Sequence, residues 1–151
     1  VTNFVIDDES SWKKLLIKVD ILPPSLVLAQ AANESAWGTS RFATSGNNFF
    51  GQWCYKKGCG LVPKKRGSDQ EHEVAAFNSP QESLESYMQN LNSHQAYKEL
   101  RAIRAQLRTN KQTITGVALS AGLTKYSERG QDYIAELRAM IKFNKLAKYD
   151  K

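Results

Sequence analysis

One apolar segment constrains the fold of this 151-residue chain more than any other feature. From Leu22 to Ala36 nearly every residue is apolar or small, and Pro23-Pro24 stands near its start, where a helix has no use for a proline N–H. A helix that is apolar on all sides is buried, so this segment predicts the central helix of the fold. Gly38, just after Trp37, suits the left-handed conformation that ends many helices.

Glu34 interrupts this helix near its end. An ionised carboxylate loses hydration among apolar neighbours, and the negative end of the helix dipole disfavours its charge, so we expect the pKa of Glu34 to be raised. Trp37 can add an apolar wall. A carboxyl that stays protonated near neutral pH can act as general acid on a glycosidic oxygen. From the residues alone, this general acid and a Glu34 that simply faces solvent where the helix emerges are equally favoured.

Helical spacing recurs on both sides of a region that lacks it. A first helix is expected to begin at Ser10 or Ser11 as N-cap, because an apolar stripe follows on one face. The stripe consists of Trp12, Leu15, Leu16 and Val19. Ser79-Pro80-Gln81-Glu82 is a capping box with proline at its first helical position, so it predicts another helix start. Later helices are expected over about 97–107, over about 115–121 and from about Gln131.

Residues 39–78 lack this spacing and hold five of the nine glycines. They predict an irregular lobe in which residues 73–77 form a short strand. No repeat, low-complexity tract or linker divides the chain, so we expect a single domain over residues 1–151. The expected class is α+β and mostly α, with the β-containing lobe 39–78 inserted after the central helix.

The chain has two cysteines, Cys54 and Cys59. Their spacing is wider than that of a redox Cys-x-x-Cys, and two sulfur ligands are too few for a zinc site. Lys57-Gly58 between them suits a tight turn, which can bring the sulfurs into bonding range. A disulfide here indicates an oxidising compartment, whereas two free, buried thiols are the alternative.

The formal net charge of +6 favours polyanions as partners, or serves only solubility. The densest basic cluster, Lys64-Lys65-Arg66, comes with no nucleic-acid motif, so no nucleic-acid partner is expected. No run of about 18 apolar residues is present, so membrane anchoring is expected only through a segment that preceded Val1.

His72-Glu73 lacks the second histidine of a His-Glu-x-x-His zinc motif, and no phosphate-binding glycine loop occurs. We therefore expect neither a metal nor a cofactor. His94, between two expected helices, is interpreted as a hydrogen-bonded structural residue.

Several segments resemble one family of bacterial enzymes. Ala32-Asn33-Glu34-Ser35-Ala36-Trp37-Gly38 resembles the A-x-E-S-x-W-G signature of the glucosaminidase domains of glycoside hydrolase family 73. Further segments are similar to that family's N-N-x-F-G step and to its Bax-like branch. These are Gly46-Asn47-Asn48-Phe49-Phe50-Gly51, Gln52-Trp53-Cys54, Cys59-Gly60-Leu61-Val62-Pro63, His72-Glu73-Val74, Asn90-Leu91-Asn92-Ser93-His94-Gln95-Ala96-Tyr97, and Tyr126-Ser127-Glu128-Arg129-Gly130 with Tyr133. The resemblance covers roughly residues 15–137, with its segments in the order that the family has.

The resemblance implies a lysozyme-like fold and cleavage of the β-1,4 bond between N-acetylglucosamine and N-acetylmuramic acid in peptidoglycan. Glu34 falls on the position of the family's catalytic acid. A second acid in the lobe is implied, and Glu73 is favoured because the His-Glu-Val step matches. Glu71 is its rival, since alternation along a strand would put both on one face. Asp69 is a third choice, solvated loop charges are the alternative for all three, and attack by the sugar's own N-acetyl oxygen needs none of them.

The resemblance also implies that Tyr133 lines the active site, where its hydroxyl can bond the catalytic acid or the substrate; a core tyrosine is the alternative. Tyr126 is a weaker candidate. The expected substrate contacts come from the two signatures and from aromatic side chains that can stack on sugars or form the core of the lobe. They are Trp37, Asn48, Phe49, Phe50, Trp53, Tyr55 and Glu71.

The sequence therefore predicts an endo-β-N-acetylglucosaminidase that acts on peptidoglycan strands, as a monomer, in the bacterial cell envelope. A lytic transglycosylase or muramidase would use the same fold and acid. A glycan-binding module without activity is the alternative from another class.

Overall fold

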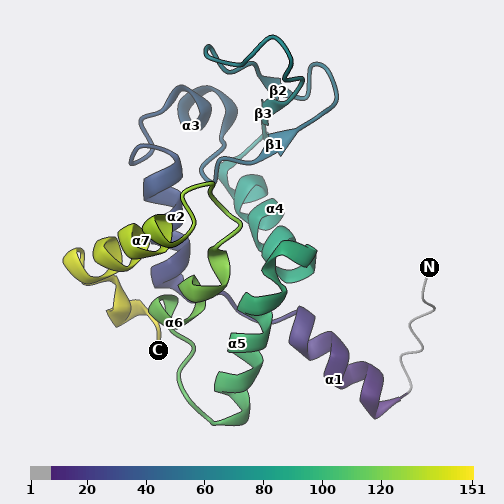
Figure 1. Ribbon diagram of the computed structural model, residues 1–151, viewed down its shortest axis with the longest axis vertical. Helices are drawn as coiled ribbons and strands as arrows, with labels where there is room; N and C mark the ends of the chain where they lie inside the picture. Colours follow the sequence, from purple (N-terminus) through teal and green to yellow (C-terminus); the bar gives the residue numbers. More distant parts are fainter. Residues whose placement is uncertain (1–7) are drawn as a thin grey trace. The chain divides into compact units, whose positions relative to one another are not determined.

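The computed structural model describes residues 8–151, which cluster into two compact units. We call residues 8–27 with 89–151 the helical unit, and residues 28–88 the lobe unit. The boundaries fall inside α2 (Pro24–Glu34) and α4 (Pro80–Ser93), which Figure 1 labels with the other elements. Over the described residues there are seven α-helices and one three-stranded sheet, so the predicted α+β, mostly α class is confirmed. The single domain stays a prediction.

The helical unit contains four α-helices besides the parts of α2 and α4 that belong to it. They are α1 (Glu9–Lys18), α5 (Lys98–Thr109), α6 (Gly116–Ser120) and α7 (Gln131–Phe143), with 3-10 turns at Gln95–Tyr97, Ala121–Leu123 and Leu146–Tyr149. Its core is aliphatic and includes Leu100, Leu119, Leu123, Ile134, Leu137 and Ile141. Gly122 permits a close contact between segments, because a Cβ there would lie 2.3 Å from the Cα of Leu100. None of the helices in the described part of the chain combines the length and apolarity that crossing a bilayer requires.

The first helix differs from its prediction in two ways. Its N-cap is Asp8, whose carboxylate accepts a hydrogen bond from the Ser10 N–H at 3.2 Å, so the predicted cap at Ser10 or Ser11 was wrong. Its apolar stripe is also not buried, since Leu16 is 63% and Val19 59% exposed. The helix α1 lies beside α5, but this contact buries none of the residues of α1.

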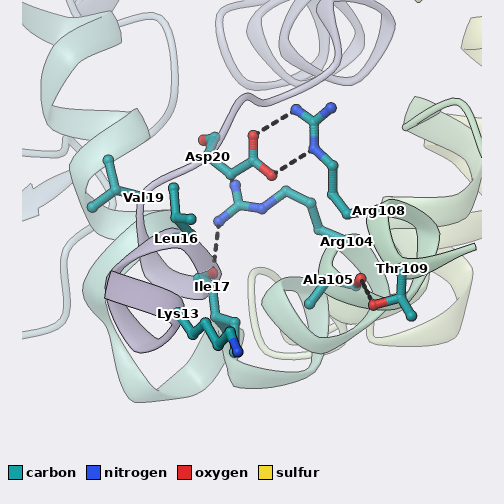
Figure 2. A pocket seen from close by; sticks show the side chains of 9 residues that line it. All are labelled: Lys13, Leu16, Ile17, Val19, Asp20, Arg104, Ala105, Arg108 and Thr109. Atoms are coloured by element: carbon teal, nitrogen blue, oxygen red, sulfur yellow. Dashed lines mark hydrogen bonds and ion pairs between the residues drawn. The ribbon is translucent and has the colours of Figure 1, made fainter. Parts of the chain in front are cut away.

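A buried arginine on α5 holds the end of α1. Arg104 is 1% exposed, and its guanidinium donates hydrogen bonds to four backbone carbonyls. The acceptors are Ile17 (3.2 Å), Lys18 (3.1 Å), Asp20 (3.0 Å) and Ile21 (3.0 Å). Figure 2 draws Arg104 beside the ion pair between Asp20 and Arg108, whose closest atoms are 2.8 Å apart. A cavity of about 530 Å³ lies here between α1 and α5, and none of the predicted site residues lines it.

The lobe unit contains the end of α2, the short helix α3 (Arg41–Gly46), the sheet and most of α4. The strands are β1 (Trp53–Cys54), β2 (Gly60–Leu61) and β3 (Glu73–Ala75), in the order β1-β3-β2 with antiparallel pairing throughout. The strand predicted over 73–77 is therefore present but ends at Ala75. The sequence did not predict α3, because six residues with a Ser40 N-cap carry too little helical pattern.

The central helix is shorter than predicted and not buried all round. It ends at Glu34, and the next turn passes through three residues with positive φ: Ala36 (49°), Trp37 (57°) and Gly38 (79°). Leu26 and Ala29 are fully buried, whereas Leu28 is 45% exposed. The predicted start of α4 is confirmed, because Ser79 Oγ accepts a hydrogen bond from the Glu82 N–H at 3.2 Å.

Candidate active site

Glu34 is the last residue of α2 and is partly exposed. The turn that follows is fixed by Ser35, which is 1% exposed. Its hydroxyl donates to the Ala31 carbonyl at 2.5 Å and accepts from the Gly38 N–H at 2.8 Å. Because this turn is held at both ends, the carboxylate of Glu34 projects from a defined backbone.

The backbone of Gly51 lies against that carboxylate. A Cβ built on Gly51 would be 2.9 Å from Oε2 and 3.8 Å from Cβ of Glu34, and Gly51 itself has a φ of +68°. Both the close approach and the positive φ call for glycine here. The second predicted signature, residues 46–51, therefore ends directly at the predicted acid. The sequence placed Gly51 in a motif but gave it no role.

Asn48 holds the segment that carries Gly51. It is 1% exposed, and its Nδ2 donates to the carbonyls of Gln52 at 3.0 Å and Ala75 at 2.8 Å. Its Oδ1 accepts from the N–H groups of Phe50 and Gln52, both at 3.2 Å. All four hydrogen-bonding positions of the carboxamide are thus used inside the lobe unit. This geometry assigns Asn48 to positioning the Gly51 turn and does not support the direct substrate contact predicted for it.

The two neighbouring phenylalanines differ. Phe50 is 4% exposed and stacks on Tyr87, with ring centroids 4.1 Å apart, while the Tyr87 hydroxyl donates to Oε1 of Gln30 at 2.5 Å. Phe50 therefore lies in the core of the lobe unit, which corrects its prediction as a substrate contact. Phe49 is partly exposed and lies beside Gly38 in the turn after α2.

Two residues that the sequence did not single out support this loop. The N–H of Phe49 donates to Ser83 Oγ at 3.1 Å, and the Gln52 side chain donates to the Ser83 carbonyl at 2.9 Å. Ser83 lies in α4 and is fully buried.

Three aromatic side chains of the lobe unit are exposed. They are Trp37 (65%), Trp53 (55%) and Tyr55 (73%). Trp53 stacks on His72, with ring centroids 3.8 Å apart and an interplanar angle of 16°. These three keep the accessibility that a sugar-stacking residue requires.

Glu73, the favoured second carboxylate, is buried and fully engaged. Its oxygens accept hydrogen bonds from the backbone N–H groups of Gly58 at 3.0 Å and Gly60 at 2.9 Å. These two hydrogen bonds, with the nearby charges of Arg66 and Lys57, hold the pKa of Glu73 below its ordinary value despite burial. Its carboxylate is therefore ionised but already occupied by the backbone that it holds.

The other two acids of the lobe, Asp69 and Glu71, are exposed. Glu71 precedes β3, so the expectation that Glu71 and Glu73 share one face stays a prediction. Of the three carboxyls within residues 39–78, Asp69 and Glu71 are thus the accessible ones.

Cys54 and Cys59 form a disulfide, which excludes the alternative of two free thiols. Their sulfur atoms and a carboxylate oxygen of Glu73 lie within 4.8 Å of one another. Such a cluster has the right elements for a metal, but bonded sulfurs are not thiolates, and only the carboxylate is left as a strong ligand. The cluster instead joins the loop 54–59 to β3.

The remaining predicted residues belong to the helical unit. Tyr133 is 1% exposed, and its ring lies parallel to that of Tyr126, with centroids 5.8 Å apart. Tyr126 in turn lies 5.9 Å from Tyr97. His94 accepts a hydrogen bond from the Ala96 N–H at 3.1 Å as an N-cap, which confirms its structural role. The roles predicted for Tyr133 and Tyr126 toward the substrate stay predictions.

Comparison with known proteins identifies the family of the chain. A family model described as mannosyl-glycoprotein endo-beta-N-acetylglucosaminidase matches residues 9–146. The chain belongs to this glucosaminidase family. It is also 43% identical over 134 residues to the protein named Protein bax of Escherichia coli (strain K12), which covers 88% of this chain and 47% of that protein. The chain thus spans about half the length of the curated relative that it matches. No solved structure matches it.

The Bax-like branch of this family, predicted from the sequence, is confirmed. The predicted site residues that the structure brings together are Glu34 and the 46–51 segment, with Gly51 next to the carboxylate and the two turns held by Ser35 and Asn48.

Proposed function

We propose that the chain is an endo-β-N-acetylglucosaminidase that hydrolyses the β-1,4 bond from N-acetylglucosamine to N-acetylmuramic acid, with Glu34 as general acid. The observation that carries the proposal is the setting of Glu34. Its carboxyl leaves a turn fixed by Ser35 and lies against the bare backbone of Gly51. Catalysis is favoured by a proton donor that is in place before the substrate arrives. The Ser35 turn fixes the backbone after Glu34, and the Gly51 backbone limits where the carboxyl can move.

In the proposed reaction Glu34 gives its proton to the glycosidic oxygen while the bond from that oxygen to the anomeric carbon breaks. The electron pair stays with the leaving oxygen, and positive charge develops on the sugar ring. Water then adds to the anomeric carbon and loses a proton to the glutamate carboxylate, which restores the acid.

Three groups are candidates to stabilise that positive charge: Glu73, Glu71 and the N-acetyl oxygen of the substrate. The hydrogen bonds from Gly58 and Gly60 occupy Glu73 and lower its basicity, which argues for a positioning role. Glu71 is exposed in the lobe and has an accessible carboxylate. Attack by the N-acetyl oxygen of the substrate needs neither residue. Separate Glu71→Gln and Glu73→Gln variants discriminate, since equal, near-wild-type rates in both would favour the substrate-assisted route.

The test of the acid is Glu34→Gln, which keeps the shape of the side chain and removes the proton. Release of muropeptides from purified peptidoglycan should fall by at least about 100-fold, while the folded state is unchanged. Glu85→Gln is the matched control, because Glu85 is an exposed glutamate on α4 of the same unit. Near-wild-type activity of Glu34→Gln would overturn the assignment, and inactivity of the unmodified chain would favour a glycan-binding module.

Mass spectrometry of the products tests which bond is cut. Reducing-end N-acetylglucosamine supports the proposal. Reducing muramic acid ends would identify a muramidase, and anhydromuramic ends a lytic transglycosylase. The proposed site of action is the cell envelope outside the cytoplasm, and the Cys54–Cys59 disulfide supports it, because disulfides persist in oxidising compartments. A monomer is the proposed working form.

A further inference from the structure

The helix α1 presents an apolar face that the helical unit does not cover. Trp12, Leu16 and Val19 are spaced i, i+4 and i+7, so they lie on one side of the helix. They are 48%, 63% and 59% exposed, respectively. These three side chains are called here the α1 face.

The attachment of α1 to the helical unit keeps this face accessible. Arg104 holds only the C-terminal end of the helix, through the carbonyls of residues 17, 18, 20 and 21. Figure 1 shows the rest of α1 extending away from α5. Leu16, Ile17 and Val19 are among the residues that line the cavity between the two helices (Figure 2). The packing therefore fixes α1 by its backbone and leaves its apolar side chains open.

The charges of α1 are almost all positive. From Ser10 to Val19 the chain has three lysines and no acidic residue, and all three lysines are exposed. Because successive residues of a helix are rotated by about 100°, Lys13 and Lys18 lie on the two sides of the α1 face and Lys14 lies opposite to it. Glu9, the one acid of α1, is paired with Lys13 at 2.9 Å. An apolar face flanked by cations results.

This pattern matches the surface of a membrane that contains anionic lipids. The apolar face of such a helix enters the boundary between headgroups and acyl chains, while lysine side chains extend to the phosphates. An indole is favoured at this depth, because its ring is apolar and its N–H is polar.

The length and charge of α1 restrict how it can be covered. Its ten residues form a helix about 15 Å long, which is about half the thickness of the hydrocarbon core, so α1 can lie on a bilayer but not cross it. A second copy of the chain matches less well, because a symmetric contact between two α1 faces would bring the lysines of both copies together.

We propose that the α1 face binds peripherally to a membrane surface that contains anionic lipids. In this arrangement Trp12, Leu16 and Val19 enter the headgroup region, and Lys13 and Lys18 face the phosphates. The proposal goes beyond the proposed function, since it involves neither a glycan nor Glu34. It also departs from the expectation that membrane contact requires a segment before Val1.

Binding is measured by co-sedimentation of the unmodified chain with lipid vesicles at low salt. The affinity for phosphatidylglycerol vesicles should be at least about tenfold higher than for phosphatidylcholine vesicles, because only the former carry a net negative charge. Equal affinity for the two lipids, or no binding to phosphatidylglycerol vesicles, would overturn the proposal. Because no glycan is present, failure of the catalytic proposal would appear only in the muropeptide assay.

The apolar arm uses Leu16→Gln, which should weaken binding to phosphatidylglycerol vesicles about tenfold, since a leucine side chain no longer leaves water. Leu28→Gln is the matched control, because Leu28 is a 45% exposed leucine of the lobe unit. Equal losses in the two variants would overturn the role of the α1 face.

The position of the contact is measured by tryptophan fluorescence. The chain has three tryptophans, so a Trp37→Phe, Trp53→Phe variant keeps only the indole of Trp12. Its emission should shift to shorter wavelengths on phosphatidylglycerol vesicles and should be quenched by lipids with brominated acyl chains. A Trp12→Phe, Trp37→Phe variant keeps only Trp53 and should show neither change. The opposite result would place the membrane contact on the lobe unit and overturn the proposal.

The charge arm uses Lys13→Gln with Lys18→Gln, controlled by Lys64→Gln with Lys65→Gln in the densest basic cluster of the chain. Both pairs remove two positive charges, but only the α1 pair should lose several-fold affinity for phosphatidylglycerol vesicles at low salt. Equal losses would overturn the role of the flanking lysines. Sedimentation velocity without vesicles tests the other occupant, since a dimer that Leu16→Gln dissociates would identify a second copy and overturn the membrane proposal.

Discussion

The carboxylate of Glu34 and the backbone of Gly51 are in contact: a Cβ on Gly51 would lie 2.9 Å from Oε2 of Glu34. Carbon and oxygen do not approach so closely without a shift, and here the atom that must move is the carboxylate itself. Gly51 thereby limits the position of the proposed proton donor, while Ser35 fixes the turn that follows it.

The first prediction follows from this contact. Gly51→Ala should lower muropeptide release by about 10-fold or more, because displacing a catalytic group by a fraction of an ångström is enough for such a loss. Gly58→Ala is the matched control, since Gly58 has a similarly positive φ of +82° but a Cβ there would meet no other atom within 4 Å. Both variants carry similar backbone strain, so only the Gly51 variant should lose activity beyond its loss of stability. Equal activity losses in the two variants would contradict the contact.

The second prediction concerns the stability of the loop held by Glu73 at low pH. Backbone hydrogen bonds from Gly58 and Gly60 hold the pKa of Glu73 below its ordinary value in the folded chain. A depressed folded pKa adds stability that is complete above the unfolded pKa and is lost as pH falls through the folded one. The protection of the Gly58 and Gly60 amides against hydrogen exchange should therefore decrease as the pH falls from about 5 downward.

The Glu73→Gln variant provides the check on this prediction. It should lack that acid-dependent step and should show lower protection of one or both amides already at neutral pH. Glu71→Gln should behave as the wild type, because Glu71 is exposed. An unchanged pH dependence in Glu73→Gln would assign the effect to another group.

Most of the helical framework could be predicted from local pattern. The Ser79 capping box and the Gln131 helix start appear where expected, because capping and helical spacing are local properties. The exposure of the apolar stripe on α1 could not be predicted, because the spacing of apolar residues shows that they share a face but not whether another element covers that face. Its contact with α5 depends on Arg104, a charged residue that sequence reasoning would leave in solvent.

The residues of the candidate site could be predicted from the sequence, but the role of each residue could not. Glu34 and the 46–51 segment were found together, yet the contact through Gly51 depends on a positive φ far along the chain from α2. Asn48 and Phe50 were expected at the substrate and instead hold the lobe together. A polar or aromatic residue in a motif does not show whether its partner is a ligand or the protein's own backbone; only the three-dimensional contacts decide this.

The third prediction is that the disulfide stabilises only modestly. Cys54 and Cys59 are five positions apart, and closing so short a loop restricts the unfolded chain by about 2 kcal/mol in the chain-entropy model. Glu73 also holds the loop through Gly58 and Gly60, so the loop should stay in place after reduction. Urea unfolding with and without reductant measures the difference, and a Cys54→Ser, Cys59→Ser double variant should not respond to reductant. Complete unfolding on reduction would show that Glu73 cannot hold the loop alone.

The fourth prediction tests the buried arginine of the helical unit. Arg104→Met keeps an apolar chain of similar length but leaves the carbonyls of residues 17, 18, 20 and 21 without their donor. Carbonyls that lose a charged partner in a buried position cost more than an ordinary hydrogen bond, so the free energy of unfolding should fall by about 3 kcal/mol. Arg129→Met is the control, because Arg129 pairs with Glu136 at the surface, with side chains 56% and 38% exposed, and should cost about 1 kcal/mol or less. Urea midpoints of the two variants check the difference. Similar midpoints would mean that α1 leaves α5 in the variant at little cost and that its carbonyls are satisfied by water.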